Sequence, residues 1–116
     1  MLKGDFIRLR HILDAAKEAI ELTRGVSQQD LKSNRTLCLS LIYLIANIGE
    51  ASNYVSDKFR ESHLEIPWRK MIGMRNKLIH GYFNVNLDII WETVNEDLPQ
   101  LIVQIEGLMG NGNSIL

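Results

Sequence analysis

Arg75, Asn76 and His80 are the residues whose types and spacing best suit a chemical reaction. Arginine carries a fixed, planar charge that matches phosphate oxygens, and histidine can donate or accept a proton near neutral pH. The asparagine beside the arginine adds a neutral hydrogen-bond donor. Together these groups could cleave an RNA phosphodiester without a metal, with histidine transferring protons and arginine stabilising the charge that develops on the phosphate.

This reaction requires two histidines, because one takes the proton of the 2′-hydroxyl while another protonates the leaving 5′-oxygen. The chain supplies only His80 in this region, so we expect a two-fold dimer that brings two copies of the site into one cleft. The alternative is structural. Arginine followed five residues later by histidine occurs by chance in many helices, and a histidine favours the C-terminal end of a helix through the helix dipole. Spacing alone leaves both interpretations open.

Positive charge is concentrated around these residues, although the chain as a whole has a net charge of −1. Residues 66–87 contain Arg69, Lys70, Arg75 and Lys77 and no carboxylate, so nine cations and 14 carboxylates remain elsewhere. A local positive field suits a phosphate-bearing ligand, which makes Arg69, Lys70 and Lys77 candidate contacts to RNA phosphates. A chance run of cations on a solvated helix face is the alternative.

The sequence argues against several other classes of protein. The lone cysteine, Cys38, permits no disulfide within the chain and agrees with a reducing cytoplasm. His11, His63 and His80 lack metal-ligand spacing, so we expect no metal site and no cofactor. The longest apolar run, residues 37–48, is far shorter than the roughly 20 residues of a spanning helix, and no signal-peptide core develops. We therefore expect a cytoplasmic protein without membrane contact.

Apolar residues recur at helical spacing in four segments, and no strand pattern or repeat is evident. Asp5 is the expected N-cap of a first helix that extends to about residue 24. A second helix is predicted over residues 34–60. The third begins at Pro67 and ends at His80, with Gly81 as its left-handed cap.

The last predicted helix begins at Asn86 or Asp88 and extends to about residue 108. Pro99 lies inside it. We expect a kink or a restart near Asp97, because proline removes one helical hydrogen bond and clashes with the preceding turn.

These segments predict an all-α, antiparallel bundle of four to five helices. It forms a single domain over residues 1–110, followed by a flexible, glycine-rich tail at 111–116. Residues 37–46 are apolar nearly all the way round their helix, and a domain this small is not expected to cover every face. The extra apolar surface predicts a homodimer in which this helix contributes to both the core and the interface.

A helix that continues to His80 places Arg75, Asn76 and His80 within one sector of about 140°. Ile72 and other apolar residues share this sector, so the charge of Arg75 needs a partner or a cleft. Glu50 is the candidate for an internal ion pair, and a cleft walled partly by a second subunit is the alternative. Glu50 is equally consistent with an exposed position and with a supporting role beside the site.

A longer pattern surrounds these residues. Pro-Trp-Arg at 67–69 and Met-Arg-Asn-Lys-Leu-Ile-His-Gly-Tyr-Phe at 74–83, followed by Trp91 and by Asp-Leu-Pro at 97–99, resemble the HepT-type toxins of the HEPN superfamily. Ile-Gly-Glu-Ala at 48–51 matches another element of that family. The resemblance covers nearly the whole chain and is far more specific than the arginine–histidine spacing alone.

The resemblance implies an all-α, HEPN-like homodimer that acts as a metal-independent endoribonuclease, the toxin of a type II/VII-like toxin–antitoxin pair. Arg75 and His80 match the catalytic pair, and Asn76 matches the polar residue after the arginine. The implied antitoxin is a minimal nucleotidyltransferase (MNT), usually encoded adjacently, that transfers AMP from ATP to the tyrosine matching Tyr82. AMP at this position would add negative charge and a bulky base beside the catalytic pair, and would block RNA.

Two other functions remain open. The chain could be a non-catalytic HEPN dimer that binds RNA, a nucleotide or the nucleotidyltransferase. It could also be the antitoxin, neutralising a toxic nucleotidyltransferase. RNA cleavage and the growth of cells that express each partner alone distinguish these functions.

Overall fold

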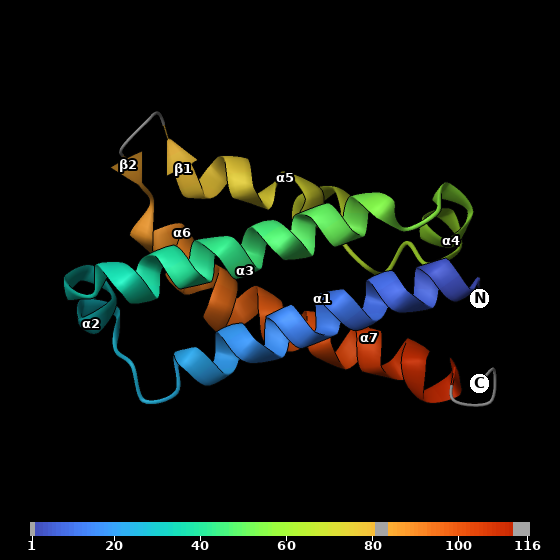
Figure 1. Cartoon of the computed structure of the whole chain (residues 1–116), viewed down its shortest axis with the longest axis horizontal. Helices are drawn as coiled ribbons and strands as arrows, with labels where there is room; N and C mark the ends of the chain where they lie inside the picture. The colour runs from blue at the N-terminus through green and yellow to red at the C-terminus, as the bar shows by residue number, and fades with distance from the viewer. Residues whose placement is uncertain (1, 81–83, 113–116) are drawn as a thin grey trace.

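The computed structural model describes residues 2–80 and 84–112 of the chain. Four long helices make up most of the molecule (Figure 1): α1 (Lys3–Leu22), α3 (Arg35–Tyr54), α5 (Trp68–Leu78) and α7 (Leu98–Gly112). Helix α3 crosses the middle of the molecule and packs against α1 on one side and α5 on the other, while α7 packs against α1. The helix α5, which carries Arg75 and Asn76, is therefore an outer element with α3 as its support.

Shorter elements connect the long helices: α2 (Gln28–Ser33), α4 (Asp57–Ser62), β1 (Ile79–His80), β2 (Asn84–Val85), α6 (Leu87–Glu92) and the π-helical segment η1 (Thr93–Asp97). The predicted all-α bundle is confirmed, with two unpredicted strands of two residues each at one end. Within residues 2–80 and 84–112, no helix combines the length and the apolar character needed to cross a membrane.

The core is built from the apolar faces of all four long helices. Its fully buried large side chains include Leu9, Ile12, Leu41, Ile45, Ile48, Met71, Leu78, Leu98 and Ile105. Cys38 is buried in this core, and burial raises the pKa of its thiol. Three large apolar side chains of α3 remain outside the core, since Leu39 is 48% exposed, Tyr43 67% and Tyr54 60%. The single chain therefore leaves part of α3 uncovered, as its all-round apolar sequence predicts.

Asp5 does not cap the first helix, which begins at Lys3. The Asp5 side chain is buried, and its carboxylate accepts hydrogen bonds from the Ser56 N–H (2.8 Å) and the Ser56 hydroxyl (2.7 Å). The same hydroxyl accepts a hydrogen bond from the Phe59 N–H at 3.2 Å, in the first turn of α4. Asp5 thus fixes the junction between α3 and α4, which lies 51 residues away in the sequence.

The predicted second helix, residues 34–60, is two helices. The predicted start near residue 34 is confirmed, with Asn34 as the N-cap of α3, but α3 ends at Tyr54, and Val55 is extended and buried. Ser56 then caps α4. The chain turns here because two residues, the buried β-branched Val55 and the capping Ser56 held by Asp5, interrupt the helix.

Side-chain caps also fix the starts of two short helices, of which the start at Asn86 was predicted. Ser27 and Asp30 form a capping box at α2, and the hydrogen bond from the Ser27 N–H holds the pKa of Asp30 below its usual range. Asn86 caps α6, its side chain accepting a hydrogen bond from the Ile89 N–H at 3.1 Å.

The restart predicted near Asp97 is also observed, since η1 ends at this residue and α7 follows directly. Pro99 has no N–H to donate to the preceding turn, and the wider π-helical turn accommodates its ring. Helix α7 continues to Gly112, two residues into the segment 111–116 that we expect to be a flexible tail.

Candidate active site

Gly49 sets the position of α5 on α3. A Cβ atom at Gly49 would lie 2.7 Å from the carbonyl oxygen of Met71 and 3.3 Å from that of Ile72. Atoms do not pack this closely, so any side chain at Gly49 would push α5 away. The glycine of the Ile-Gly-Glu-Ala element therefore determines where Arg75 and Asn76 lie relative to α3.

An open cleft of about 690 Å³ lies beside this contact, between α3 and α5. Arg75 and Asn76 line it from α5, while Glu50 and Asn53 line it from α3. The other lining residues are Leu39, Ile42, Tyr43, Ala46, Asn47, Gly49 and Ile72. The cleft thus presents one cation, one carboxylate and several amides above an apolar wall, and its volume suits a small ligand or one or two nucleotides.

Arg75 and Asn76 are exposed because α5 buries another face. Its buried side chains are spaced three or four residues apart: Trp68, Met71, Met74 and Leu78. The sequence places Ile72 on this face with Met74 beside it, but Met74 is buried and Ile72 lines the cleft. Arg75 therefore reaches solvent at the mouth of the cleft, and its charge requires no internal partner.

Glu50 is exposed on the wall of the same cleft. The internal ion pair of Glu50 with Arg75 is not formed within the described part of the chain. Arg75 instead lines a cleft whose described walls, α3 and α5, belong to one chain, and the wall from a second subunit stays a prediction. Glu50 and Arg75 face one space from opposite helices, so a ligand there meets both charges.

The predicted helix ends two residues too late, because α5 stops at Leu78. Ile79 and His80 form β1, in which His80 pairs with Asn84. The Asn86 N–H donates to the Leu78 carbonyl oxygen at 2.7 Å, so the chain returning from β2 satisfies a carbonyl that a helix end leaves open. The single helical sector for Arg75, Asn76 and His80 is therefore wrong for His80, whose backbone is extended.

The described residues include the His80 backbone but not its side chain, and residues 81–83 lie outside them. The predicted Gly81 cap and the predicted modification site Tyr82 both fall in that segment. The backbone of His80 lies in β1, two residues after the end of α5, which is the helix that carries Arg75.

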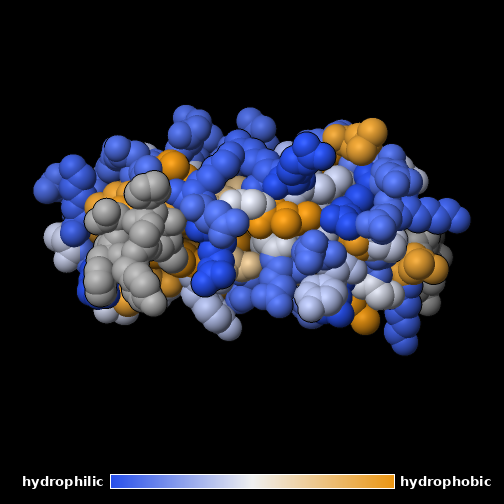
Figure 2. Space-filling view, turned by 90° about the horizontal axis from the view of Figure 1, so that it is seen from above, coloured by the Kyte–Doolittle hydropathy of each residue, from blue (hydrophilic) through white to orange (hydrophobic). Residues whose placement is uncertain are grey.

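The candidate phosphate contacts differ in their surroundings. The Lys70 ammonium pairs with the Asp97 carboxylate at 3.0 Å, so its charge is already balanced. Arg69 and Lys77 are exposed, and neither takes part in an ion pair with another described residue. Figure 2 shows the face that carries α5, which is mostly hydrophilic with a short hydrophobic strip near its centre.

Sequence reasoning missed Tyr43, Asn47 and Asn53 as cleft residues. A signal was available, because Tyr43, Glu50 and Asn53 are spaced seven and three residues apart and so share one face of α3. Which face of α3 meets α5 is set by the close contact of Gly49 with the backbone of Met71 and Ile72. That contact exists only in the folded chain.

The sequence matches the family model described as Ribonuclease HepT-like over residues 12–108, a range that includes every residue lining the cleft. A "Putative RNase" of Caldanaerobacter subterraneus subsp. tengcongensis is 39% identical over 101 residues, covering 87% of this chain and 90% of the relative. A "Probable ribonuclease HepT" of Thermococcus cleftensis is 39% identical over 100 residues, covering 86% and 91%. A "Putative RNase" of Methanocaldococcus jannaschii is 36% identical over 98 residues, covering 84% and 90%. No solved structure matches the chain. The chain belongs to the HepT-like ribonuclease family of the HEPN superfamily.

Proposed function

We propose that the protein is a metal-independent endoribonuclease whose site contains Arg75, Asn76 and His80. The observation that carries the proposal is the open cleft in which Arg75 and Asn76 are exposed, just before His80, in a chain of a ribonuclease family. Arg75 would bind the phosphate through its planar guanidinium, and Asn76 would donate a hydrogen bond to a phosphate oxygen. Glu50, on the opposite wall, would orient Arg75 once RNA is bound, and Lys77 would contact a neighbouring phosphate.

The reaction is an attack of the 2′-oxygen on the adjacent phosphorus. One neutral His80 takes the 2′-hydroxyl proton, the bond from O2′ to phosphorus forms, and the bond from phosphorus to O5′ breaks. A protonated His80 from a second chain gives its proton to the leaving O5′. The products are a 2′,3′-cyclic phosphate and a 5′-hydroxyl. Arg75 stabilises the extra negative charge that develops on the phosphate in the transition state.

The uncovered part of α3 supports a homodimer that would bring two such sites together. Leu22, Leu39 and Tyr43 are 42%, 48% and 67% exposed. These three side chains, which we call the α1–α3 apolar surface, line a depression of about 650 Å³. Leu39 and Tyr43 also line the cleft, so the surface is continuous with it. A second copy covering this surface would lie directly beside Arg75.

Purified protein incubated with RNA in the presence of EDTA tests the proposal. Cleavage should continue, the products should carry 2′,3′-cyclic phosphate ends, and Arg75→Ala and His80→Ala should each reduce the rate by about 10²-fold or more. Lys17→Ala is a matched control, because Lys17 pairs with Glu106 at 3.0 Å on the α1–α7 side. Full activity of a folded His80→Ala variant would sink the proposed site. Salt-sensitive RNA binding without cleaved ends would instead support the non-catalytic HEPN dimer.

We also propose that an adjacently encoded MNT-type nucleotidyltransferase acts as antitoxin through Tyr82. In this step the Tyr82 hydroxyl oxygen attacks the α-phosphorus of ATP, pyrophosphate leaves, and the hydroxyl proton passes to solvent. Intact mass after co-expression should show added AMP that maps to Tyr82 and is absent from Tyr82→Phe. Expressing each partner alone distinguishes the roles, because toxicity of the nucleotidyltransferase alone would reverse them.

A further inference from the structure

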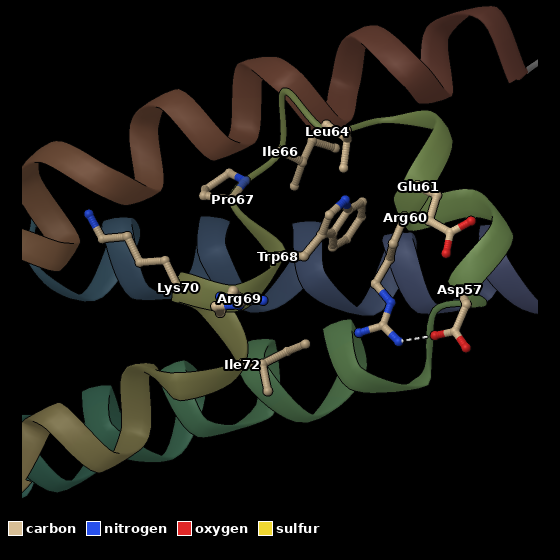
Figure 3. Close-up of a pocket in the computed structure, with 10 residues that line it drawn as sticks. All are labelled: Asp57, Arg60, Glu61, Leu64, Ile66, Pro67, Trp68, Arg69, Lys70 and Ile72. Carbon is tan, nitrogen blue, oxygen red and sulfur yellow. Dashed lines mark hydrogen bonds and ion pairs between the residues drawn. The ribbon is translucent and has the colours of Figure 1, made fainter.

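A second pocket adjoins the candidate active site along α5. It has a volume of about 620 Å³ and lies between α4 and the first turns of α5 (Figure 3). Ile72 lines both this pocket and the cleft that contains Arg75. We call this second space the α4–α5 pocket. The two depressions therefore meet at one side chain on the exposed side of α5.

Three side chains of α5 follow one line from pocket to cleft. Arg69, Ile72 and Asn76 are three and four residues apart, which places them on the same helix face. Arg69 lines the α4–α5 pocket and Asn76 lines the cleft. Seven residues of helix separate them, or roughly 10 Å along the axis. A single RNA strand that contacts Asn76 can therefore reach Arg69 within one or two nucleotides.

The walls of the α4–α5 pocket are apolar and fixed. Ile66 and Trp68 are buried, and the Trp68 indole N–H donates to the His63 carbonyl oxygen at 2.9 Å. Pro67 adds a rigid ring, and Leu64, which is 77% exposed, stands at the rim. Leu64 and Pro67 offer apolar surface on which an unpaired base can bury its face, and contact with the face of a base does not depend on which base it is.

Charge is distributed unevenly around the pocket. On the α4 side, Arg60 pairs with Asp57 at 2.5 Å, and Glu61 leaves that edge negative (Figure 3). On the α5 side, Lys70 is paired with Asp97, whereas Arg69 has no ion pair among the described residues. A phosphate would therefore bind at Arg69, between the pocket and the cleft, and would be repelled from the α4 edge.

We propose that the α4–α5 pocket holds one nucleotide of the RNA strand whose neighbouring phosphate is cleaved at Arg75. Arg69 contacts the phosphate that joins this nucleotide to the part of the strand in the cleft, and the base lies against the apolar walls. The inference rests on the proposed ribonuclease function. It assigns Arg69 a role in holding the strand and assigns Lys70, one residue later, none.

The test compares Arg69→Ala, Arg69→Lys and the matched control Lys70→Ala in binding and cleavage of fluorescent single-stranded RNA. Binding is measured with His80→Ala in the background, so that the RNA stays intact. Arg69→Ala should weaken binding by roughly threefold to tenfold and lower the slope of log K against log salt by about 0.7, the value for one phosphate contact on single-stranded nucleic acid. Arg69→Lys should restore the slope, and Lys70→Ala should leave it unchanged.

Substrate length gives an independent measurement. Arg69→Ala should raise KM for an oligonucleotide that extends several residues on both sides of the cut, with kcat little changed, and should not affect a dinucleotide too short to reach the pocket. Leu64→Ala, at the exposed rim, should reproduce part of the KM effect without changing the salt slope.

The outcomes separate this inference from the proposed function. If the wild type cleaves RNA normally but Arg69→Ala and Lys70→Ala have the same salt slope and the same KM, the pocket assignment is overturned and the proposed function stands. RNA binding with the predicted slopes but without cleavage would retain the assignment and reject the ribonuclease mechanism. A wild type that neither binds nor cleaves RNA would overturn both.

Discussion

Gly49 of α3 and the backbone of Met71 in α5 are in such close contact that a Cβ atom on Gly49 would lie 2.7 Å from the Met71 carbonyl oxygen. The oxygen belongs to helical backbone, which cannot rotate away as a side chain would. The contact therefore fixes the spacing of the two helices that form the cleft, one turn before Arg75.

Gly49→Ala should force α5 outward and destabilise the protein by about 1–3 kcal/mol, the range for overpacking a tight core. Ribonuclease activity should fall as well, because the cleft changes width. Thermal unfolding and the cleavage rate measure the two effects. Gly73→Ala is the matched control on α5, since a Cβ there meets nothing within 4 Å. It should be neutral or stabilising by up to about 1 kcal/mol through helix propensity. Equal effects of the two variants would contradict this account.

Asp5→Ala should destabilise the protein by about 1–3 kcal/mol, because the partly buried Ser56 N–H and hydroxyl lose their acceptor. Denaturant unfolding measures the change. The control is Asp14→Ala on the same helix, where an exposed carboxylate pairs with Arg10 at 3.4 Å. That substitution should cost at most about 0.5 kcal/mol. If Asp14→Ala lowers the free energy of unfolding more than Asp5→Ala does, the α3–α4 junction does not depend on Asp5.

Leu22→Glu should dissociate the proposed homodimer and abolish cleavage while leaving the monomer folded. Leu22 belongs to the α1–α3 apolar surface but does not line the cleft, so the substitution leaves the surroundings of Arg75 intact. Sedimentation velocity measures the oligomeric state. Val103→Glu introduces the same charge at an apolar side chain of α7 that is 70% exposed, and should leave the dimer unchanged. Dissociation by Val103→Glu alone would place the interface on α7 instead.

The cleavage rate should show a bell-shaped dependence on pH with a maximum near neutrality. One histidine must be neutral to accept the 2′-hydroxyl proton while the other must be protonated to assist the leaving oxygen, so the rate falls on both sides. Initial rates on a short RNA across this range, corrected for stability, give the profile. A rate that rises steadily with pH would point to hydroxide attack rather than a histidine pair.

The sequence by itself determined much of the scaffold. The spacing of Leu9, Ile12 and Ala16 predicts the buried face of α1, and Asn34 and Asn86 identify two helix starts, because these signals depend on neighbours within a turn or two. The all-round apolar sequence of α3 likewise predicts side chains that the single chain leaves uncovered, of which Tyr43 is the clearest.

Tertiary structure decided the features that depend on distant parts of the chain. Asp5 looks like a helix cap in the sequence, but it binds Ser56 because folding brings α1 beside the α3–α4 junction. Local periodicity predicts that α5 extends to His80, yet the helix ends at Leu78 because Ile79 and His80 pair with β2. The exposure of Arg75 follows from which face of α5 rests on Gly49. Local spacing gives an element its type, whereas its ends and its orientation depend on contacts that exist only after folding.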